Sequence, residues 1–397
     1  MENFDFHVTT DIRFGKDRLD ELPQVLNNFG KNVLLVYGGG SIKKNGLYDK
    51  LYELFNQNDN NVVELAGVDP NPRIETVQKG VQLCKENAID VVLPVGGGSV
   101  IDCSKAVAAC VFVSGDLWEN FVLQKNYKGP ALPIVTILTL AATGSEMNGT
   151  CVISNMDAQI KLGVHGTTNL LPKVSFLDPT NTFSVGAYQT AAGSADILSH
   201  LMENYFNATE GTEVQDEIAE GLMKTVIKYL PVALDEPDNY TARANLMWAS
   251  TLALNGLVGK GKKGSWSCHA MEHELSAFYD ITHGVGLAML TPRWMAHILD
   301  EDTLPKLQRF AEEVWNVKEK EPKRTAEIGI QKLYDFFVSC HIPMTLPEVG
   351  IQTEENFEEM GQRAVAHSSI SNQGFVPLHE DDVVSIYREC MSESSFV

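Results

Sequence analysis

The amino-acid sequence predicts an α/β domain at residues 1–184, followed by an all-α domain at residues 185–397. Up to about residue 180, short apolar runs alternate with stretches of helical period, which is typical of an open parallel sheet with helices on both faces. After about residue 187, strand-like alternation nearly disappears and apolar residues recur at helical spacing. This change in pattern places the domain boundary between residues 184 and 185.

The composition is that of an acidic globular protein. The chain has 397 residues, of which 44% are hydrophobic and 21% charged, enough apolar material for a sizeable core. A formal net charge of -21 disfavours nucleic acid and anionic membranes as partners. The seven cysteines form no CxxC pair, no apolar run reaches transmembrane length, and Met1–Phe6 lacks the apolar core of a signal peptide. We therefore expect a cytoplasmic protein with reduced thiols.

Each predicted strand of the first half is a short apolar run bounded by turn residues. These runs lie at 33–37, 61–65, 90–95, 133–140 and 174–177, and a hairpin is predicted from 152–154 and 160–165. A short edge strand and a helix are expected within residues 1–30, and further helices at 47–56, at 74–88 and from the glycines at 96–98 to about residue 112. In the second half, helical period predicts helices at 187–206, 213–231, 242–258, 303–314 and 324–340.

Two of the predicted strands end in glycine turns, at 38–41 and at 96–99. Neither turn matches the dinucleotide fingerprint GxGxxG, because Lys43 and Ile101 occupy its last position. Three glycines can also serve simply as a tight turn. Each turn, however, follows an apolar strand and opens a helix, where bare backbone N–H groups attract phosphate. Together with a third turn at 139–145, they indicate a dinucleotide site of the Rossmann-like kind.

The first turn suggests which dinucleotide is bound. NAD sites usually carry an acid that holds the ribose 2′-hydroxyl, and the turn at 38–41 has none. It has the hydroxyl of Ser41, followed by Lys43 and Lys44, so NADP(H) is favoured over NAD(H). Asp102 lies one turn into the second helix, where a carboxylate facing phosphate would repel it. We expect Asp102 to bond a ribose hydroxyl or an amide, or to cap the helix.

A candidate metal site lies in the second half. Asp196 and His200 are four residues apart, so a helix places them on one face. The segment from His269 to His273, followed by His283, can supply further imidazoles. One carboxylate and three imidazoles suit Zn(II) or Fe(II). Spacing alone leaves open which two of His269, His273 and His283 bind the ion.

The same segment supports a rival function. His269, Glu272 and His273 match HxxEH, a zinc peptidase motif in which both histidines bind the metal and the glutamate is the base. This hypothesis needs a further ligand downstream and leaves the glycine turns unexplained.

Taken together, these motifs resemble those of the iron-containing (group III) alcohol dehydrogenases, most of all the butanol dehydrogenase branch, whose members reduce aldehydes with NADPH. The resemblance covers essentially the whole chain. Its motifs lie at 38–41, 70–72, 96–102, 139–146 and 178–179, and in Asp196-x3-His200 and His269-x3-His273-x9-His283.

The resemblance implies a dehydroquinate synthase-like two-domain architecture and hydride transfer between NADP(H) and primary alcohols such as butanol and their aldehydes. It implies that the metal, iron or zinc, is bound by Asp196, His200, His269 and His283, with His273 beside the site as a candidate for proton transfer. It also implies a homodimer. The cofactor contacts that it implies are Gly39 and Ser41 at the 2′-phosphate, Gly97, Gly98 and Ser99 at the phosphates, and Asp102, Thr139, Asn148, Lys161 and Thr180 elsewhere on the cofactor.

Two expectations concern the substrate. We expect a pocket in the cleft between the domains, lined by Trp266 and Phe278. The two-domain plan is also similar to that of dehydroquinate synthase and glycerol-phosphate dehydrogenase, which act on phosphorylated substrates. The few cations near the ligand motifs, all in the loop at 260–263, disfavour such a substrate.

Overall fold

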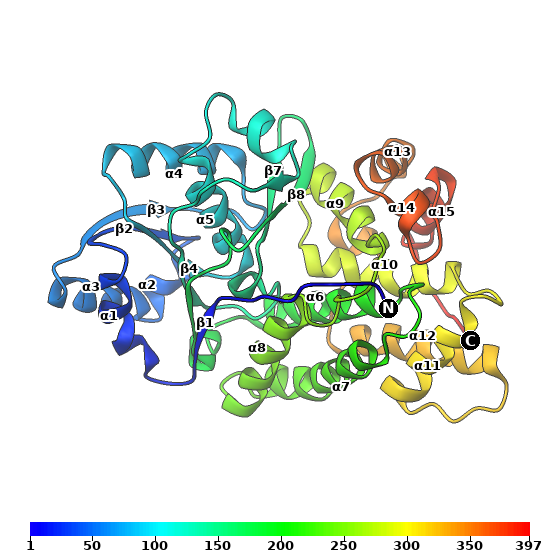
Figure 1. Ribbon diagram of the computed structural model, residues 1–397. Helices are drawn as coiled ribbons and strands as arrows, with labels where there is room; N and C mark the ends of the chain where they lie inside the picture. Colours follow the sequence, from blue (N-terminus) through cyan, green and yellow to red (C-terminus); the bar gives the residue numbers. More distant parts are fainter. The chain divides into compact units, whose positions relative to one another are not determined.

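The computed structural model describes residues 1–397 and divides the chain into two compact units (Figure 1). The sheet unit consists of His7–Val185 and Pro237–Asn255, and the helical unit consists of Met1–Phe6, Gly186–Glu236 and Gly256–Val397. The predicted fold class, an α/β Rossmann-like part and an all-α part, is confirmed.

The sheet unit is built on six parallel strands in the order β1-β9-β6-β4-β2-β3. Their bounds are β1 Asp11–Phe14, β2 Asn32–Tyr37, β3 Asn61–Ala66, β4 Val91–Gly96, β6 Val135–Leu138 and β9 Val174–Leu177. The predicted hairpin is β7 (Thr150–Asn155) and β8 (Ile160–Gly166), which pair antiparallel in a smaller sheet with β5 (Asn126–Tyr127). The helices of this unit include α1 Leu22–Asn27, α2 Ser41–Lys44, α3 Leu47–Gln57, α4 Ile74–Glu86 and α5 Gly98–Cys110.

The alternation of side chains along β2 shows that both faces of the six-stranded sheet are covered. Leu34 and Val36 belong to a buried cluster that includes residues of α4 and α5. Val33 and Leu35 belong to a second cluster, with residues of α1 and α3. A parallel sheet needs both faces buried, and each such side chain contributes about 1.5–3 kcal/mol on burial.

Four of the predicted cofactor segments follow neighbouring strands of this sheet. The turns at 38–41, 96–99, 139–145 and 178–180 come directly after β2, β4, β6 and β9. Because the strands are parallel and adjacent, these turns lie at one edge of the sheet, the edge where open α/β sheets bind ligands.

Helix α8 (Tyr240–Leu254) belongs to the sheet unit, although the predicted domain at 185–397 contains it. Met247 of α8 is buried in a cluster with sheet-unit residues. Thr251 Oγ1 donates a hydrogen bond of 2.6 Å to the buried carboxylate of Glu146. The spacing of apolar residues in the sequence reveals neither of these contacts. A single domain boundary therefore cannot assign α8 to the sheet unit.

The helical unit has eight principal helices, which are α6 Ala187–Tyr205, α7 Glu213–Asp235, α9 Ser267–Tyr279, α10 His283–His297, α11 Leu304–Trp315, α12 Pro322–Ser339, α13 Phe357–His367 and α15 Glu380–Glu389. Periodicity predicts α6, α7, α11 and α12 but not the other four. Helices α9 and α10 are buried on most sides, so their apolar residues form no single stripe.

Two further observations concern the whole chain. None of its helices combines the length and the apolar character that crossing a membrane requires. All seven cysteines are free and buried.

Candidate metal and cofactor sites

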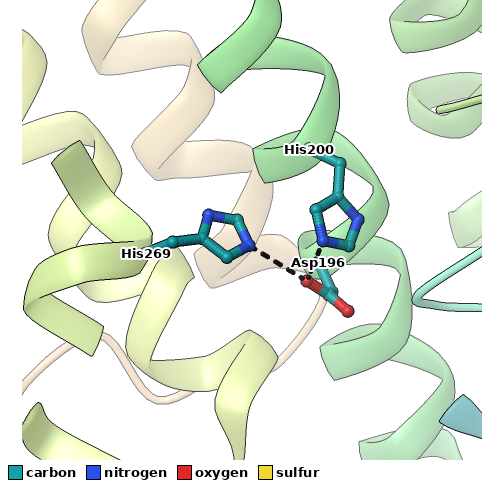
Figure 2. A group of neighbouring side chains, drawn as sticks. All are labelled: Asp196, His200 and His269. Atoms are coloured by element: carbon teal, nitrogen blue, oxygen red, sulfur yellow. Dashed lines mark ion pairs between the residues drawn. The ribbon is translucent and has the colours of Figure 1, made fainter. Parts of the chain in front are cut away.

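Helix α6 presents Asp196 and His200 on one face, as their spacing predicts. The residues around them are mostly small, which lets neighbouring helices pack closely and bury both side chains. The carboxylate oxygen Oδ1 of Asp196 lies 3.4 Å from Nε2 of His200 (Figure 2).

Helices α9 and α10 bring two more imidazoles to the same carboxylate oxygen. Nε2 of His269 lies 3.9 Å from Asp196 Oδ1, and Nε2 of His283 lies 3.7 Å from it. Figure 2 shows His269 approaching from its own helix, opposite the helix of Asp196 and His200. Of the three histidines left open by spacing, His269 and His283 have Nε2 atoms within 4 Å of Asp196 Oδ1, while His273 groups with Glu272 and His283.

The close approach of α10 to α6 depends on Gly284. A Cβ atom at this position would stand 1.9 Å from the backbone oxygen of Ala192 in α6. Because no side chain fits there, glycine next to His283 allows α10 to bring its first residue to the site.

The donor set fits a divalent metal ion. Ligand atoms about 2.1 Å from a tetrahedral ion stand roughly 3.4 Å apart, close to the separations measured from Asp196 Oδ1. The Nε2 atom of His269 is buried and has no hydrogen-bond partner. Burial, helped by the nearby His269 and His283, lowers the pKa of His200 well below its ordinary value, so this imidazole is neutral and can donate its lone pair.

The outer nitrogens of two of these histidines contact buried glutamates. Nδ1 of His269 lies 3.3 Å from Glu203 Oε1, and Nδ1 of His283 contacts Glu272 Oε2. The motifs in the sequence do not single out Glu203. The available signal is its position seven residues after Asp196, on the same face of α6.

The zinc peptidase hypothesis is not supported. It assigns Glu272 as a base acting on water at the metal, whereas this side chain is 0% exposed. Its two carboxylate oxygens contact Ser276 Oγ and His283 Nδ1. The carboxylate of Glu272 contacts Nδ1 of His283, whereas Nε2 is the nitrogen of that ring near Asp196, so Glu272 is not placed to activate a water molecule at the candidate metal position.

His273 and Trp266 lie beside the candidate ligands. The half-buried ring of His273 lies 6.4 Å from the ring of His269 and 5.8 Å from that of His283, centroid to centroid. The centroid of the Trp266 indole lies 4.8 Å from that of the His269 ring, with the two ring planes tilted by 56°. Phe278, the other predicted pocket residue, packs under the guanidinium of Arg363, 4.8 Å from the ring centroid.

The glycine turns of the sheet unit differ from one another. A Cβ atom at Gly39 or Gly40 would meet nothing within 4 Å, and Gly40 has a φ of +92°, which favours glycine. In the second turn, a Cβ at Gly98 would stand 2.2 Å from Thr143 Oγ1, so this glycine allows the turn to pack against the neighbouring loop. The first turn is therefore open to a ligand, and the second is shaped by its neighbour.

Behind the second turn, Asp102 and Asn148 belong to a buried polar network centred on Lys105. The ammonium of Lys105 donates to Ser145 Oγ at 2.7 Å and to Asn148 Oδ1 at 3.0 Å. Ser145 in turn donates to Asp102 Oδ1 at 2.5 Å, and the backbone N–H of Val152 donates to Asp102 Oδ2 at 2.9 Å. These bonds use the polar atoms of the two predicted cofactor residues to fix the loop at 143–152.

The remaining predicted cofactor residues lie near the same edge or in the small sheet. Gly39 and Ser41 are exposed, Thr139 and Thr180 follow β6 and β9, and the hydroxyl of Ser99 donates to Pro70 O. Lys161, in β8, is buried close enough to Asp102 to act against the rise that burial causes in the pKa of that carboxyl.

The two lysines after the first turn have different surroundings. The ammonium of Lys43 lies 4.5 Å from the ring centroid of Tyr48 and 3.9 Å from Glu64, whose carboxylate also accepts hydrogen bonds from Tyr37 and Tyr48. Lys44 is exposed. The support that Lys43 lends to a 2′-phosphate site is therefore weaker than the sequence suggests.

Comparison with known proteins gives matches along nearly the whole chain. Residues 9–179 match the family model described as iron-containing alcohol dehydrogenase, and residues 190–391 match the C-terminal model of the Fe-containing alcohol dehydrogenase family. The NADH-dependent butanol dehydrogenase A of Clostridium acetobutylicum is 49% identical over 390 residues, 98% of this chain and 100% of that protein. The NADPH-dependent aldehyde reductase YqhD of Escherichia coli is 36% identical over 353 residues, 88% of this chain and 90% of that protein.

The solved structures agree with these matches. The crystal structure of NADH-dependent butanol dehydrogenase A from Thermotoga maritima superposes with a TM-score of 0.93 at 37% identity, covering 99% of each chain.

Proposed function

Because the chain belongs to the iron-containing alcohol dehydrogenase family, we propose that it interconverts primary alcohols, such as butanol, and their aldehydes by hydride transfer. The observation that carries this proposal is the convergence of three imidazole nitrogens on Asp196 Oδ1 in a buried site. Neither the peptidase alternative nor an enzyme of the dehydroquinate synthase or glycerol-phosphate dehydrogenase kind finds support.

The residues of the helical unit have distinct roles in this proposal. Asp196, His200, His269 and His283 would hold the ion. When bound, the ion supplies a Lewis acid for the substrate oxygen, and the nicotinamide supplies or accepts the hydride. His273 is half-buried next to two ligands, so it would pass a proton between the substrate oxygen and solvent. The indole of Trp266 packs against the imidazole of His269 and would help to hold that ring in place.

The donor set and the family description support a proposal for the metal. One carboxylate and three imidazoles suit Fe(II) or Zn(II), and the family description names iron. We propose Fe(II) as the ion, with Zn(II) able to replace it, and a homodimer as the assembly.

The cofactor preference rests on opposing observations. The open turn at 38–41 has no carboxylate to repel a 2′-phosphate, and exposed Lys44 follows it, which favours NADP(H). Against this, Lys43 is engaged by Tyr48 and Glu64, and the relative with 49% identity is named as NADH-dependent. We propose that the turn accepts NADPH and does not exclude NADH.

The first experiment compares the wild type with Asp196→Ala and His269→Ala, using His297→Ala as the matched control because His297 pairs with Asp382 at the surface. Elemental analysis measures bound metal, and oxidation of NADPH and of NADH with butanal measures activity. Both ligand variants should lose metal and activity together, while the control keeps both. Activity retained without metal would overturn the mechanism.

A further inference from the structure

We propose that Glu203 and Glu272 are positioning residues, which hold His269 and His283 with their Nε2 lone pairs directed at the metal ion. The inference rests on the proposed metal site and adds to it two residues that do not bind the ion. Their contacts, burial and place in the helices carry the argument.

Glu203 fixes both the ring and the backbone of His269. Its Oε1 accepts the backbone N–H of His269 at 2.8 Å and lies 3.3 Å from Nδ1 of the same residue. Its Oε2 accepts the backbone N–H of Ser267 at 2.9 Å. Since α9 begins at Ser267, a carboxylate from α6 caps the N-terminus of α9 and orients the imidazole in its first turn.

Glu272 performs the corresponding task for His283. Its Oε2 contacts Nδ1 of His283, and its Oε1 accepts a hydrogen bond from the hydroxyl of Ser276. A Cβ atom at position 286 would stand 2.8 Å from Cγ of Glu272, so Gly286 in α10 leaves room for this side chain. These contacts hold the carboxylate of Glu272 against Nδ1 of His283.

These contacts decide which nitrogen of each ring carries the proton. A carboxylate next to Nδ1 favours the tautomer with N–H at Nδ1, which leaves the lone pair on Nε2. In both rings Nε2 is the atom that faces Asp196 Oδ1. His200 provides an internal contrast, because its Nδ1 is buried without a hydrogen-bond partner.

The charge of the site supports the same conclusion. Asp196, Glu203 and Glu272 are 2%, 6% and 0% exposed, so three carboxylates are buried around three imidazoles. Buried carboxylates are stable when they are hydrogen-bonded or when they coordinate a cation. Glu203 and Glu272 would each accept the Nδ1 proton of a ring that holds the cation, and would thereby strengthen metal binding through that ring.

The chain offers a matched control in Glu274. This glutamate lies on α9, is 3% exposed, and contacts Nδ1 of His367 at 2.9 Å. It is a buried glutamate against a histidine Nδ1, as Glu203 and Glu272 are, and it shares α9 with Glu272, but His367 is not among the imidazoles within 4 Å of Asp196 Oδ1.

The test measures Zn²⁺ affinity by competition with a chelator for the wild type, E203Q, E272Q, E274Q and D196A. Loss of a glutamate behind a ligand should weaken Zn²⁺ binding roughly 10–100-fold, with E274Q unchanged and D196A weakened more. The visible spectrum of the Co²⁺-loaded protein should change in E203Q and E272Q and stay as in the wild type in E274Q, because it reports the ligand geometry.

The outcomes separate the two proposals. Wild-type affinity and spectra in E203Q and E272Q, with metal lost in D196A, would refute the positioning role and leave the proposed function intact. Wild-type affinity in D196A would refute the metal site itself. If E203Q fails to fold because its α9 cap is lost, E272Q decides, since Glu272 bonds a side chain at each oxygen.

Nuclear magnetic resonance of the Zn²⁺-loaded wild type, labelled with nitrogen isotope in histidine, needs no variant at all. Exchange-protected Nδ1 protons assigned to both His269 and His283 support the inference. Absence of the protected Nδ1 proton from either ring would overturn it for that ring, whatever His367 shows.

Discussion

The candidate metal site of the helical unit and the polar network of the sheet unit both consist of polar side chains inside the protein, but these side chains are bonded differently. In the network, Lys105, Ser145 and Asp102 bond one another and the neighbouring backbone. In the metal site, the imidazole nitrogens face a single carboxylate oxygen, and Nε2 of His269 is buried without a hydrogen-bond partner. The polar groups of the network are thus bonded to one another, whereas those of the candidate site leave a buried nitrogen that a bound metal ion would satisfy.

The largest expected effect comes from removing the metal. Treatment with a strong chelator should lower butanal reduction about a thousandfold, equivalent to about 4 kcal/mol of transition-state stabilisation. Binding of NADPH to the glycine turns should persist, because no residue of the sheet unit is among the proposed ligands. Elemental analysis measures the bound metal, and NADPH fluorescence measures cofactor binding. Loss of cofactor binding together with the metal would contradict the independence of the two regions.

Next in size is the effect of Lys105→Met on stability. Removing the ammonium leaves Asp102 and Ser145 in a buried site without their cation, which should lower the free energy of unfolding by about 3–5 kcal/mol. Urea unfolding measures the loss. Bound metal should remain at the wild-type level in the folded fraction, so a fall in metal content per folded molecule would contradict the independence of the two regions.

The same lysine gives a pH dependence with a definite sign. Burial lowers the pKa of Lys105 to about 8 from its ordinary 10.5, with Asp102 and Glu146 acting against the shift. Between these values the unfolded chain binds a proton that the folded chain does not, so this group's contribution to stability rises with pH. The difference in unfolding free energy between wild type and Lys105→Met should therefore grow from about pH 7.5 to about pH 9. A difference that shrinks would contradict the assignment.

A smaller effect is expected where the helical unit is packed most closely. Gly284→Ala sets a methyl group against the backbone oxygen of Ala192, and such overpacking costs about 1–3 kcal/mol. Gly221→Ala in α7 meets nothing within 4 Å and should stabilise the protein by about 0.5–1 kcal/mol. Thermal unfolding compares them, and metal affinity should fall only in the first variant. Equal effects would show that the crossing of α6 and α10 does not control the site.

The smallest effect concerns the first glycine turn. An exposed ion pair contributes about 0.2–1 kcal/mol, so Lys44→Met should raise KM for NADPH at most about fivefold and leave KM for NADH unchanged. Lys43→Met should not discriminate between the cofactors, because Lys43 is engaged by Tyr48 and Glu64. Steady-state kinetics with both cofactors checks this. A selective effect of Lys43 alone would reassign the 2′-phosphate contact.

The features that could be predicted from the sequence depend on the local spacing of residues or on the resemblance to a known family. The strands that became β2 and β4 are continuous apolar runs, as full burial in a parallel sheet requires. Asp196 and His200 share one face because helical spacing fixes it, whereas the expectation that His269 and His283 are ligands came from the family resemblance. These predictions need no knowledge of which helices pack together.

What the sequence does not reveal depends on contacts between distant segments. The contacts of Glu203 form only when α6 packs against the N-terminus of α9, and the residues around Glu203 in the sequence do not predict this packing. The sequence does not show that the two oxygens of Asp102 accept hydrogen bonds from Ser145 and from the backbone N–H of Val152. Spacing cannot show that a neighbouring loop already uses a polar side chain.

Helix α8 follows part of the helical unit in the sequence but belongs to the sheet unit, and this affects how the chain can be cut or rearranged. The backbone passes from one unit to the other at 6–7, 185–186, 236–237 and 255–256, so no single cut releases an intact half. A fragment ending at residue 185 would lack Thr251, and the carboxylate of Glu146 would lose that donor together with the cover over the Met247 cluster. We therefore expect that neither unit can be obtained as a folded fragment by a single protease cut, and that circular permutation and fragment complementation must keep all four connections between the units.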